Sequence, residues 1–376
     1  MRFILFLITS VFSASLYGQG CCSGGCANPI AGGASPGVLL EKQMEIGTSF
    51  QYINGNKFLA KDKDTSALFD NFNSQYIYSR IGYGVTKNLT VSVETGYFIN
   101  KSQMGLNKID SARSSGFGDL IIFPKYDVYN QTDEKRKIEF TLGLGYKIPL
   151  GKHSDSTFTW YDSVQSIAHY TISPPLVQPT TGSQDIILYA FFFRGFPQKN
   201  FRLFANTTYI KKGWNSSGEK FGDYASIGLF AGKTFFKSLG ITLQLKAEWV
   251  DKMQYNTYAD KLIGGGNSIV ALYNIDIRST GSKKIFFAPQ LSYNYKSFAL
   301  YAMYEIPVYQ YVNGAQVSTS PFTIGLSYKF FTSKGLSAKT GETIYRCPMK
   351  CEGGDSKEPG KCRICGMELM PETLPK

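Results

Sequence analysis

Polar and apolar residues alternate with a period of two, over segments of about ten residues, through most of the chain between residues 44 and 331. In the segment 241–249 the residues Ile241, Leu243, Leu245 and Ala247 alternate with polar neighbours. Successive side chains of a β-strand point to opposite faces, so this pattern predicts strands with one apolar and one polar face. The same alternation recurs in the segments 89–97, 138–150 and 322–330.

The pattern predicts about twelve strands, and the connections between them indicate how they assemble. Long connections (55–74, 100–116, 151–183) alternate with short ones (85–87, 130–136, 196–200). A soluble β-sandwich also alternates along its strands, but long loops on one side and tight turns on the other are typical of an outer-membrane β-barrel. The expected strands are 44–54, 75–84, 88–99, 117–129, 137–149, 184–195, 201–211, 223–235, 241–251, 284–295, 298–309 and 321–331.

The two faces of these strands have different expected surroundings. Aromatic residues near strand ends are expected to face lipid at the two bilayer interfaces: Tyr97, Phe98, Tyr146, Tyr209, Trp249 and Tyr295. The opposite face carries charges of both signs, which a dry core would not tolerate and a polar lumen would. They are Glu94, Glu139, Lys147, Arg202, Lys246, Glu248, Glu305 and Lys329.

The N-terminus has the features of a secretory signal peptide. Arg2 precedes the apolar run FILFLITSVF and a group of small residues, and the run is too short to span a membrane as a helix. We expect residues 1–20 to be removed, with cleavage after Gly18 or Gly20. Acylation of Cys21 is an alternative, but residues 17–20 lack the Leu-small-small pattern that precedes an acylated cysteine.

Composition narrows the choice of partners. The chain has a formal charge of +12, yet its Lys and Arg are scattered, and export makes nucleic acid an implausible partner. Outer-membrane lipid and lipopolysaccharide are the expected counter-charges, unless the charge serves only solubility. No Ser-His-Asp framework, phosphate loop or nucleotide-binding glycine pattern is present, so we do not expect an enzyme.

The C-terminal segment YRCPMKCEGGDSKEPGKCRICGMELMP contains two close pairs of cysteines. Cys347 and Cys351 are separated by three residues, and Cys362 and Cys365 by two. Thiolates at such spacing can converge on one soft metal ion. Four thiolates would suit Zn²⁺, whereas fewer thiolates with Met349 or Met367 would favour Cu⁺ or Ag⁺. Disulfides within the pairs are the alternative, because an exported protein meets oxidising conditions.

This segment resembles the small heavy-metal-binding domain of copper- and silver-efflux proteins, periplasmic adaptors and some metal-pumping ATPases. The resemblance implies a soft-metal site and, as partners, periplasmic efflux or metal-carrier proteins. Lys350 and Cys351 depart from the usual Cys-Pro-Met-His-Pro, so Cys351 is expected to replace the histidine. The matching residues are Tyr345, Cys347, Pro348, Met349, Pro359, Gly360, Cys362, Cys365, Gly366, Met367, Leu369 and Pro371.

Two further groups of candidate ligands stand elsewhere. Cys21, Cys22 and Cys26 open the mature chain and could form an incomplete soft-metal site, a disulfide with one free thiol, or nothing specific. His153 and His169 lie in the long loop 151–183, where metal capture is possible but ordinary surface residues are the expected case.

The stretch 116–126, GFGDLIIFPKY, resembles a segment of a broad family of bacterial outer-membrane barrels labelled as transporters or linked to uptake in aromatic-compound degradation. The expected organisation is therefore a signal peptide (1–20), a periplasmic Cys/Gly-rich segment (21–43), a barrel (44–331), a linker (332–343) and a metal-binding domain (344–376). With an even number of strands, the first and the last strand of the barrel both have their free chain ends in the periplasm. The tail, which follows the last strand, is therefore expected there too.

Together these features predict an all-β protein of the outer membrane that binds copper, silver or zinc through its tail, in metal transport or homeostasis. One alternative is a channel for small organic molecules in which the metal knuckle is only a structural or docking module. A second alternative is a non-conducting barrel that anchors a metal scavenger or sensor.

Overall fold

The computed structural model describes residues 37–106, 111–132, 137–236, 238–256, 279–295, 297–332, 343–346, 355–360 and 369–373. The descriptions below refer to these residues. Within them, no helix is both long and apolar enough to cross a membrane.

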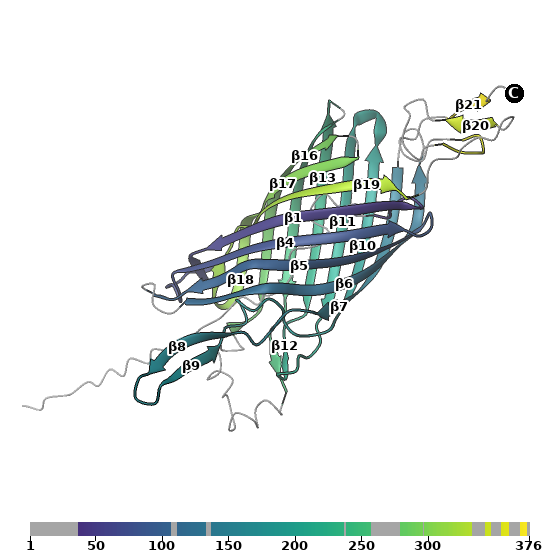
Figure 1. Ribbon diagram of the computed structural model, residues 1–376. Coiled ribbons are helices and arrows are strands. Elements are labelled where there is room, and N and C mark those ends of the chain that lie inside the picture. Colours follow the sequence, from purple (N-terminus) through teal and green to yellow (C-terminus); the bar gives the residue numbers. More distant parts are fainter. Residues whose placement is uncertain are drawn as a thin grey trace, which may run out of the picture.

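Twelve antiparallel strands close into a barrel (Figure 1), which confirms the predicted fold and strand count. The ring closes where the first strand pairs with the last, from Gln43↔Phe331 to Tyr52↔Phe322. Around the ring the strands are β1 (Gln43–Gly55), β4 (Asn71–Gly84), β5 (Leu89–Met104), β6 (Ser111–Thr132), β7 (Lys137–Pro149), β10 (Asp185–Phe196), β11 (Phe201–Lys211), β13 (Tyr224–Phe235), β14 (Leu239–Val250), β16 (Ser282–Tyr295), β17 (Phe298–Tyr304) and β19 (Phe322–Phe331).

The segment predicted as one strand over 298–309 is divided in the structure. β17 ends at Tyr304, and after Glu305 the chain continues as β18 (Ile306–Ser318), which stays beside β16 and then pairs with β2 (Lys57–Lys61). β3 (Lys63–Asp64) follows β2. Smaller pairs are β8 (Ser156–Asp162) with β9 (Ile167–Ile172), β12 (Glu219–Lys220) with β15 (Gln254–Tyr255), and β20 (Thr343–Arg346) with β21 (Met370–Thr373).

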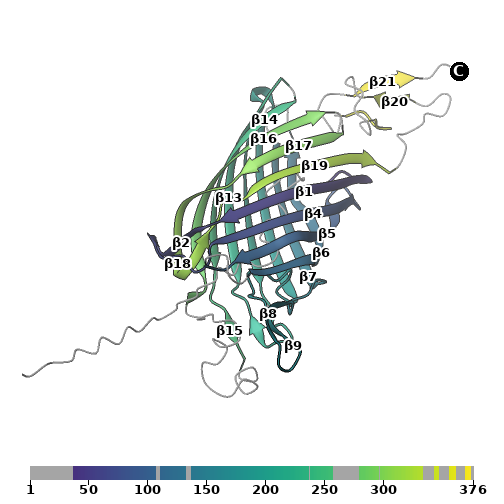
Figure 2. The ribbon, with the colours of Figure 1, turned by 60° about the vertical axis from the view of Figure 1, so that its left-hand side comes forward.

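The barrel has two unlike ends. The end at which short connections join the strands, such as the 3₁₀ turn Pro197–Lys199 between β10 and β11, is called the turn end here. The opposite end, the loop end, carries the β8–β9 hairpin and β12 (Figures 1 and 2). The prediction of a long loop over 100–116 was wrong. β5 and β6 extend into this range and stay paired as far as Met104↔Ser111.

Alternation sorts the side chains as predicted, with one exception among the aromatic residues. Lipid-facing residues such as Leu245 and Trp249 are exposed, whereas Lys246 on the same strand is buried inside. Phe98 was predicted to face lipid but is buried in the lumen, where its ring lies 4.4 Å from that of Tyr76. The reason is the period of two, which sends Phe98 to the face opposite its exposed neighbour Tyr97.

Candidate functional site

The lumen nearest the turn end contains a network centred on Arg80 of β4. Its Nη1 lies 3.3 Å from Glu45 Oε2 on β1, and its Nε lies 3.2 Å from Glu94 Oε1 on β5. Tyr78 donates its hydroxyl to Glu94 Oε2 at 2.6 Å, and Lys329 Nζ lies 3.4 Å from Glu45 Oε1. Four neighbouring strands of the ring, including both closing strands, are therefore joined by charges as well as by backbone.

The N-terminal segment 37–42 lies within the turn end. Leu39 is buried and donates its N–H to Thr90 Oγ1 at 2.7 Å. Gly37 lies so close to the Glu139 carboxylate that a Cβ would collide with it. Lys42 N–H donates to Gly84 O at 2.7 Å before β1 begins. This segment therefore narrows the lumen at its turn end.

A second network lies across the lumen on β14. Lys246 Nζ lies 2.9 Å from Glu248 Oε1 and 2.8 Å from Glu305 Oε2, and all three side chains are largely buried. Tyr224 donates its hydroxyl to Glu248 Oε1 at 3.0 Å. One ammonium thus contacts two carboxylates, and Lys284 of β16 interacts electrostatically with Glu248 as well.

A third network fixes part of the long loop inside the barrel. Residues 173–183, called the inner loop here, are mostly buried. Lys147 Nζ contacts Asp119 Oδ2 at 3.2 Å and Asp185 Oδ2 at 2.8 Å, and it also donates to Thr181 Oγ1 at 2.8 Å. Thr180 donates to Asp119. The predicted inward face of Lys147 is therefore confirmed, and its contacts hold the inner loop.

Backbone carbonyls of the inner loop are also bound. Lys101 Nζ donates to Gln178 O at 2.8 Å and lies 4.7 Å from the centre of the Phe98 ring. Ser114 donates to Val177 O, and Asn215 Nδ2 donates to Thr181 O at 3.1 Å. Partners from β5, β6 and the connection after β11 thus hold the inner loop across the loop end of the lumen.

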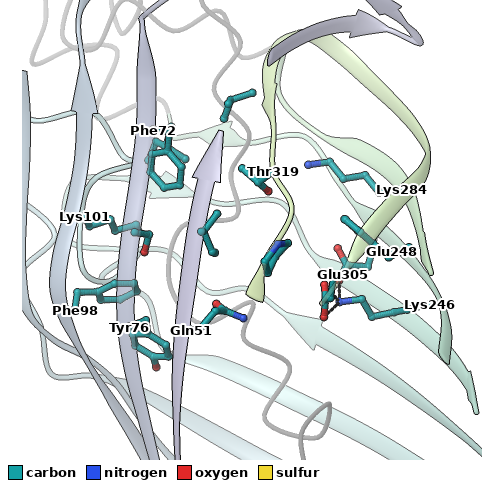
Figure 3. A pocket seen from close by; sticks show the side chains of 16 residues that line it. Gln51, Phe72, Tyr76, Phe98, Lys101, Lys246, Glu248, Lys284, Glu305 and Thr319 are labelled. Carbon is teal, nitrogen blue, oxygen red and sulfur yellow. Dashed lines mark hydrogen bonds and ion pairs between the residues drawn. The ribbon is translucent and has the colours of Figure 1, made fainter. Parts of the chain in front are cut away.

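A cavity of about 80 Å³ remains between the inner loop and the second network (Figure 3). Its wall combines aromatic rings with charged groups, and Lys284 points into it from β16. Lining residues include Phe72, Tyr76, Phe98, Lys101, Leu176, Lys246, Glu248, Lys284, Phe286 and Glu305. The described wall contains no Cys or His, so this cavity does not offer a soft metal the ligands it prefers.

The predicted metal ligands of the tail lie outside the described residues: Cys347, Cys351, Cys362, Cys365, Met349 and Met367. The N-terminal candidates Cys21, Cys22 and Cys26 lie outside them as well. His153 Nε2 lies 2.9 Å from Ser216 Oγ, and the side chain of His169 is not described. Within the described part of the chain, no group of three or more Cys, His, Asp or Glu residues could hold a metal ion.

The segments that flank the tail cysteines are described, and they close two small loops. Tyr345 and Ser356 exchange backbone hydrogen bonds of 2.9 Å, so Cys347 and Cys351 belong to a chain segment whose ends meet. Leu369 N–H donates to Gly360 O at 2.8 Å and closes the segment with Cys362 and Cys365 in the same way. β20 and β21 join the two loops through four residue pairs, from Thr343↔Thr373 to Arg346↔Met370.

Sequence reasoning missed the inner loop and two carboxylates that hold it, Asp119 and Asp185. The run PPLVQPTTGS has the composition of an exposed turn, so period and polarity do not predict its burial. The signal that could have revealed this contact is the opposite charge of Asp185 and Lys147. Asp185 begins β10 and lies directly opposite Lys147 of β7, on the same face of the sheet.

Comparisons with known proteins agree with both parts of the chain. Residues 344–372 match the heavy metal binding domain family. No curated protein sequence matches the chain. Among solved structures, an outer membrane channel from Pseudomonas putida F1 aligns with 80% of this chain and 99% of its own length, with a TM-score of 0.58 and 12% identity. The β domain of the Bordetella autotransporter BrkA covers 77% of this chain and 99% of its own, with a TM-score of 0.42 and 10% identity.

The barrel therefore has the fold of outer-membrane β-barrels, whose apolar outer band contacts membrane lipid. The segment that matches the heavy metal binding domain family follows it in the same chain.

Proposed function

We propose that this protein is a non-enzymatic outer-membrane β-barrel that binds a soft heavy metal, namely copper, silver or zinc, through its Cys-rich tail in metal transport or homeostasis. The observation that carries the proposal is the pair of loops closed at Tyr345–Ser356 and Gly360–Leu369, joined by β20 and β21. In the sequence, one cysteine pair lies between the ends of each loop, and this supports a site that the four thiols share. Four thiolates complete a tetrahedral site for one soft ion.

In this proposal Cys347, Cys351, Cys362 and Cys365 hold the ion, with Met349 and Met367 as further sulfur donors for Cu⁺. The ion is cargo, and it is passed on by exchange of one thiolate for another. The tail would lie in the periplasm beneath the turn end, where a periplasmic efflux or metal-carrier protein could exchange the ion. The linker 332–343 would keep the site at a high effective concentration near the barrel.

Metal binding is tested on the full-length protein in detergent under reducing conditions. A chromophoric Cu⁺ chelator competes for the ion, and we expect about one tightly held Cu⁺ per chain, as four thiolates around one ion require. Replacing Cys362 and Cys365 together by Ser should abolish tight binding. The matched control replaces Cys21, Cys22 and Cys26 by Ser, and it should retain the tail site. Unchanged affinity in the Cys362/Cys365 variant would refute the assignment.

The periplasmic position of the tail is tested separately in intact cells. A membrane-impermeant maleimide should fail to label the tail cysteines until the outer membrane is permeabilised. Labelling of Cys347–Cys365 in intact cells would place the tail outside and would contradict the proposed orientation.

A second candidate function is a channel for small organic molecules, with the metal domain as a structural or docking module. The cavity favours it, because its described wall offers rings and ammonium groups in place of thiols and imidazoles.

A third candidate is a non-conducting barrel that anchors a metal scavenger or sensor. The inner loop and the segment 37–42 favour it, because they narrow the lumen at its loop end and its turn end. Conductance and solute uptake in liposomes, with and without Cu⁺, distinguish the three, since only metal transport should respond to the ion.

A further inference from the structure

The barrel wall is interrupted at the loop end between β1 and β18. The β1–β19 ladder stops at Tyr52↔Phe322, while β1 continues to Gly55 with β4 as its partner. On the other side, β18 runs beside β16 from Ile306 to Val312 and gains its second described neighbour, β2, only at Val312. Between these edges the described wall consists of residues 319–321, which belong to no strand.

This three-residue segment separates two hollow spaces. On the inner side, Thr319 and Pro321 line the cavity of Figure 3, together with Gln51 and Ile53 of β1. On the outer side, Ser320 lines a groove of about 480 Å³. The other residues of this groove include Tyr52, Asn54, Tyr304, Gln310 and Phe322. Alternate residues of the same stretches thus line a luminal cavity and a lipid-side groove, with one thickness of chain between them.

Few contacts hold the segment in place. Glu305 N–H donates to Pro321 O at 2.9 Å, and Gln310 Nε2 donates to Ser318 Oγ at 2.6 Å. Pro321 has no N–H to offer to a ladder. Gly55 fits because it lacks a Cβ, which would lie 2.6 Å from Ser318 O. The wall here is close-packed but lacks the continuous ladder that fixes the rest of the barrel.

The groove has the chemistry of a membrane interface. Tyr52, Tyr304 and Phe322 expose 37%, 44% and 40% of their surface, and such rings mark the boundary between hydrocarbon and head groups. Asn54, Gln310 and Ser320 add hydrogen-bonding groups within the groove. An amphiphile with its polar end at this height matches both parts.

The cavity behind the seam contains an ammonium that could receive an anion. Lys284 is 6% exposed and points into the cavity, and the structure gives it no hydrogen bond or ion pair among the described residues. Glu248 interacts with it electrostatically but is already bound by Lys246 and Tyr224. A buried ammonium without a close partner is costly, and an anionic group in the cavity would relieve that cost.

We propose that the seam between β1 and β18 is a lateral port, closed here by residues 319–321, through which a single-chain amphiphile with an anionic head group enters the cavity and pairs with Lys284. The apolar chain of the amphiphile would lie against Phe72 and Phe286 and extend through the seam into the outer groove. The port opens when residues 319–321 move, which breaks the Glu305–Pro321 hydrogen bond and no strand ladder. This site does not depend on metal binding by the tail.

The test uses the full chain in liposomes with a photoreactive diazirine fatty acid as the probe and the matching fatty alcohol as its uncharged partner. Labelled residues are mapped by mass spectrometry. The acid should label the groove and the cavity wall at Phe72 and Phe286, and the alcohol should label the cavity less. In Lys284→Met the acid should label the cavity about tenfold less, which corresponds to about 1.4 kcal/mol, and Lys284→Arg should restore labelling.

The route is tested by closing the groove from outside. Ser320→Trp should lower cavity labelling by both probes, whereas Leu188→Trp, at a lipid-facing position on β10 that is 50% exposed, should not. Heat-modifiable migration in gels confirms that each variant has folded. Equal cavity labelling by acid and alcohol, or full labelling in Lys284→Met, would overturn the anion site. Full cavity labelling in Ser320→Trp would overturn the lateral route.

Discussion

Charged residues inside this barrel are paired with partners from other strands and connections. Lys246 of β14 reaches Glu305, 59 positions along the chain, and Arg80 of β4 joins β1 and β5. The alternation of the sequence predicted that Lys246, Glu248 and Glu305 share the luminal face. It did not predict the pairing, because the contact depends on ring closure and on the break between β17 and β18.

Replacing Lys246 by Met should destabilise the barrel by about 3–5 kcal/mol, because two buried carboxylates lose the ammonium that contacts both of them. Denaturation by urea in lipid vesicles, followed by Trp fluorescence, measures this change. Glu305→Gln and the double variant complete a thermodynamic cycle. The double variant should be less destabilised than the sum of the single changes, whereas simple additivity would show that the two residues do not interact.

Asp223 gives the loop end a dependence on pH. It lies in the connection between β12 and β13 and accepts the Lys212 N–H at 2.9 Å and the Tyr209 hydroxyl at 3.0 Å, while Lys211 Nζ lies 3.1 Å away. Burial raises the pKa of Asp223, but hydrogen bonds from Lys212 N–H, Lys211 and Tyr209 outweigh it, so the pKa lies below its ordinary value.

The direction of this pH dependence follows from the linkage between proton binding and folding. A carboxyl whose pKa is lower in the folded state stabilises that state above its ordinary pKa of about 3.9, and the contribution is lost as the pH falls through the folded value. Fluorescence of Trp214, with Trp160 and Trp249 replaced by Phe, should therefore stay constant down to about pH 4 and change below it. Asp223→Asn should remove this acid transition. A transition that persists unchanged in Asp223→Asn would assign it to another group.

At the scale of elements, strands and loops differ in how far their sequence determines their place. Each predicted strand overlaps an observed one, because period two is imposed on every residue by the contrast between lipid and lumen. The inner loop carries no period. Its position depends on Lys101, Lys147 and Asn215, which come from three separate parts of the chain.

The inner loop should limit conductance. Replacing Leu176, Val177, Gln178 and Pro179 by a Gly-Ser sequence removes the buried apolar contacts and should raise single-channel conductance in planar bilayers, because glycine-rich segments do not keep a fixed position. The control makes the same replacement in the β8–β9 turn around Val164, which is 92% exposed, and should leave conductance unchanged. Equal conductance of the native and inner-loop variants would show that the restriction lies elsewhere, for example at the segment 37–42.

At the scale of the whole molecule, the barrel and the tail are built on different principles. The ring closes through ten residue pairs between β1 and β19, and Thr332 N–H adds a hydrogen bond of 3.0 Å to Lys42 O. The tail has few apolar residues, so metal is expected to supply much of its folding free energy. Its cysteine spacing made the domain recognisable from sequence, whereas the metal it selects depends on ligand geometry that spacing does not determine.

A chain that ends after Thr332 should therefore keep the barrel and lose the metal. Every strand of the ring lies within residues 43–331, so urea midpoint and heat-modifiable migration should equal those of the full chain. Cu⁺ binding should disappear, and added Cu⁺ should no longer protect any part of the protein from proteolysis, because a ligand stabilises only the state that binds it. The matched control is the full chain with Cys362 and Cys365 replaced by Ser. Like the truncated chain, it should keep the barrel and lose both Cu⁺ binding and protection by Cu⁺. A barrel that fails to assemble without residues 333–376 would show that the tail contributes to folding of the ring.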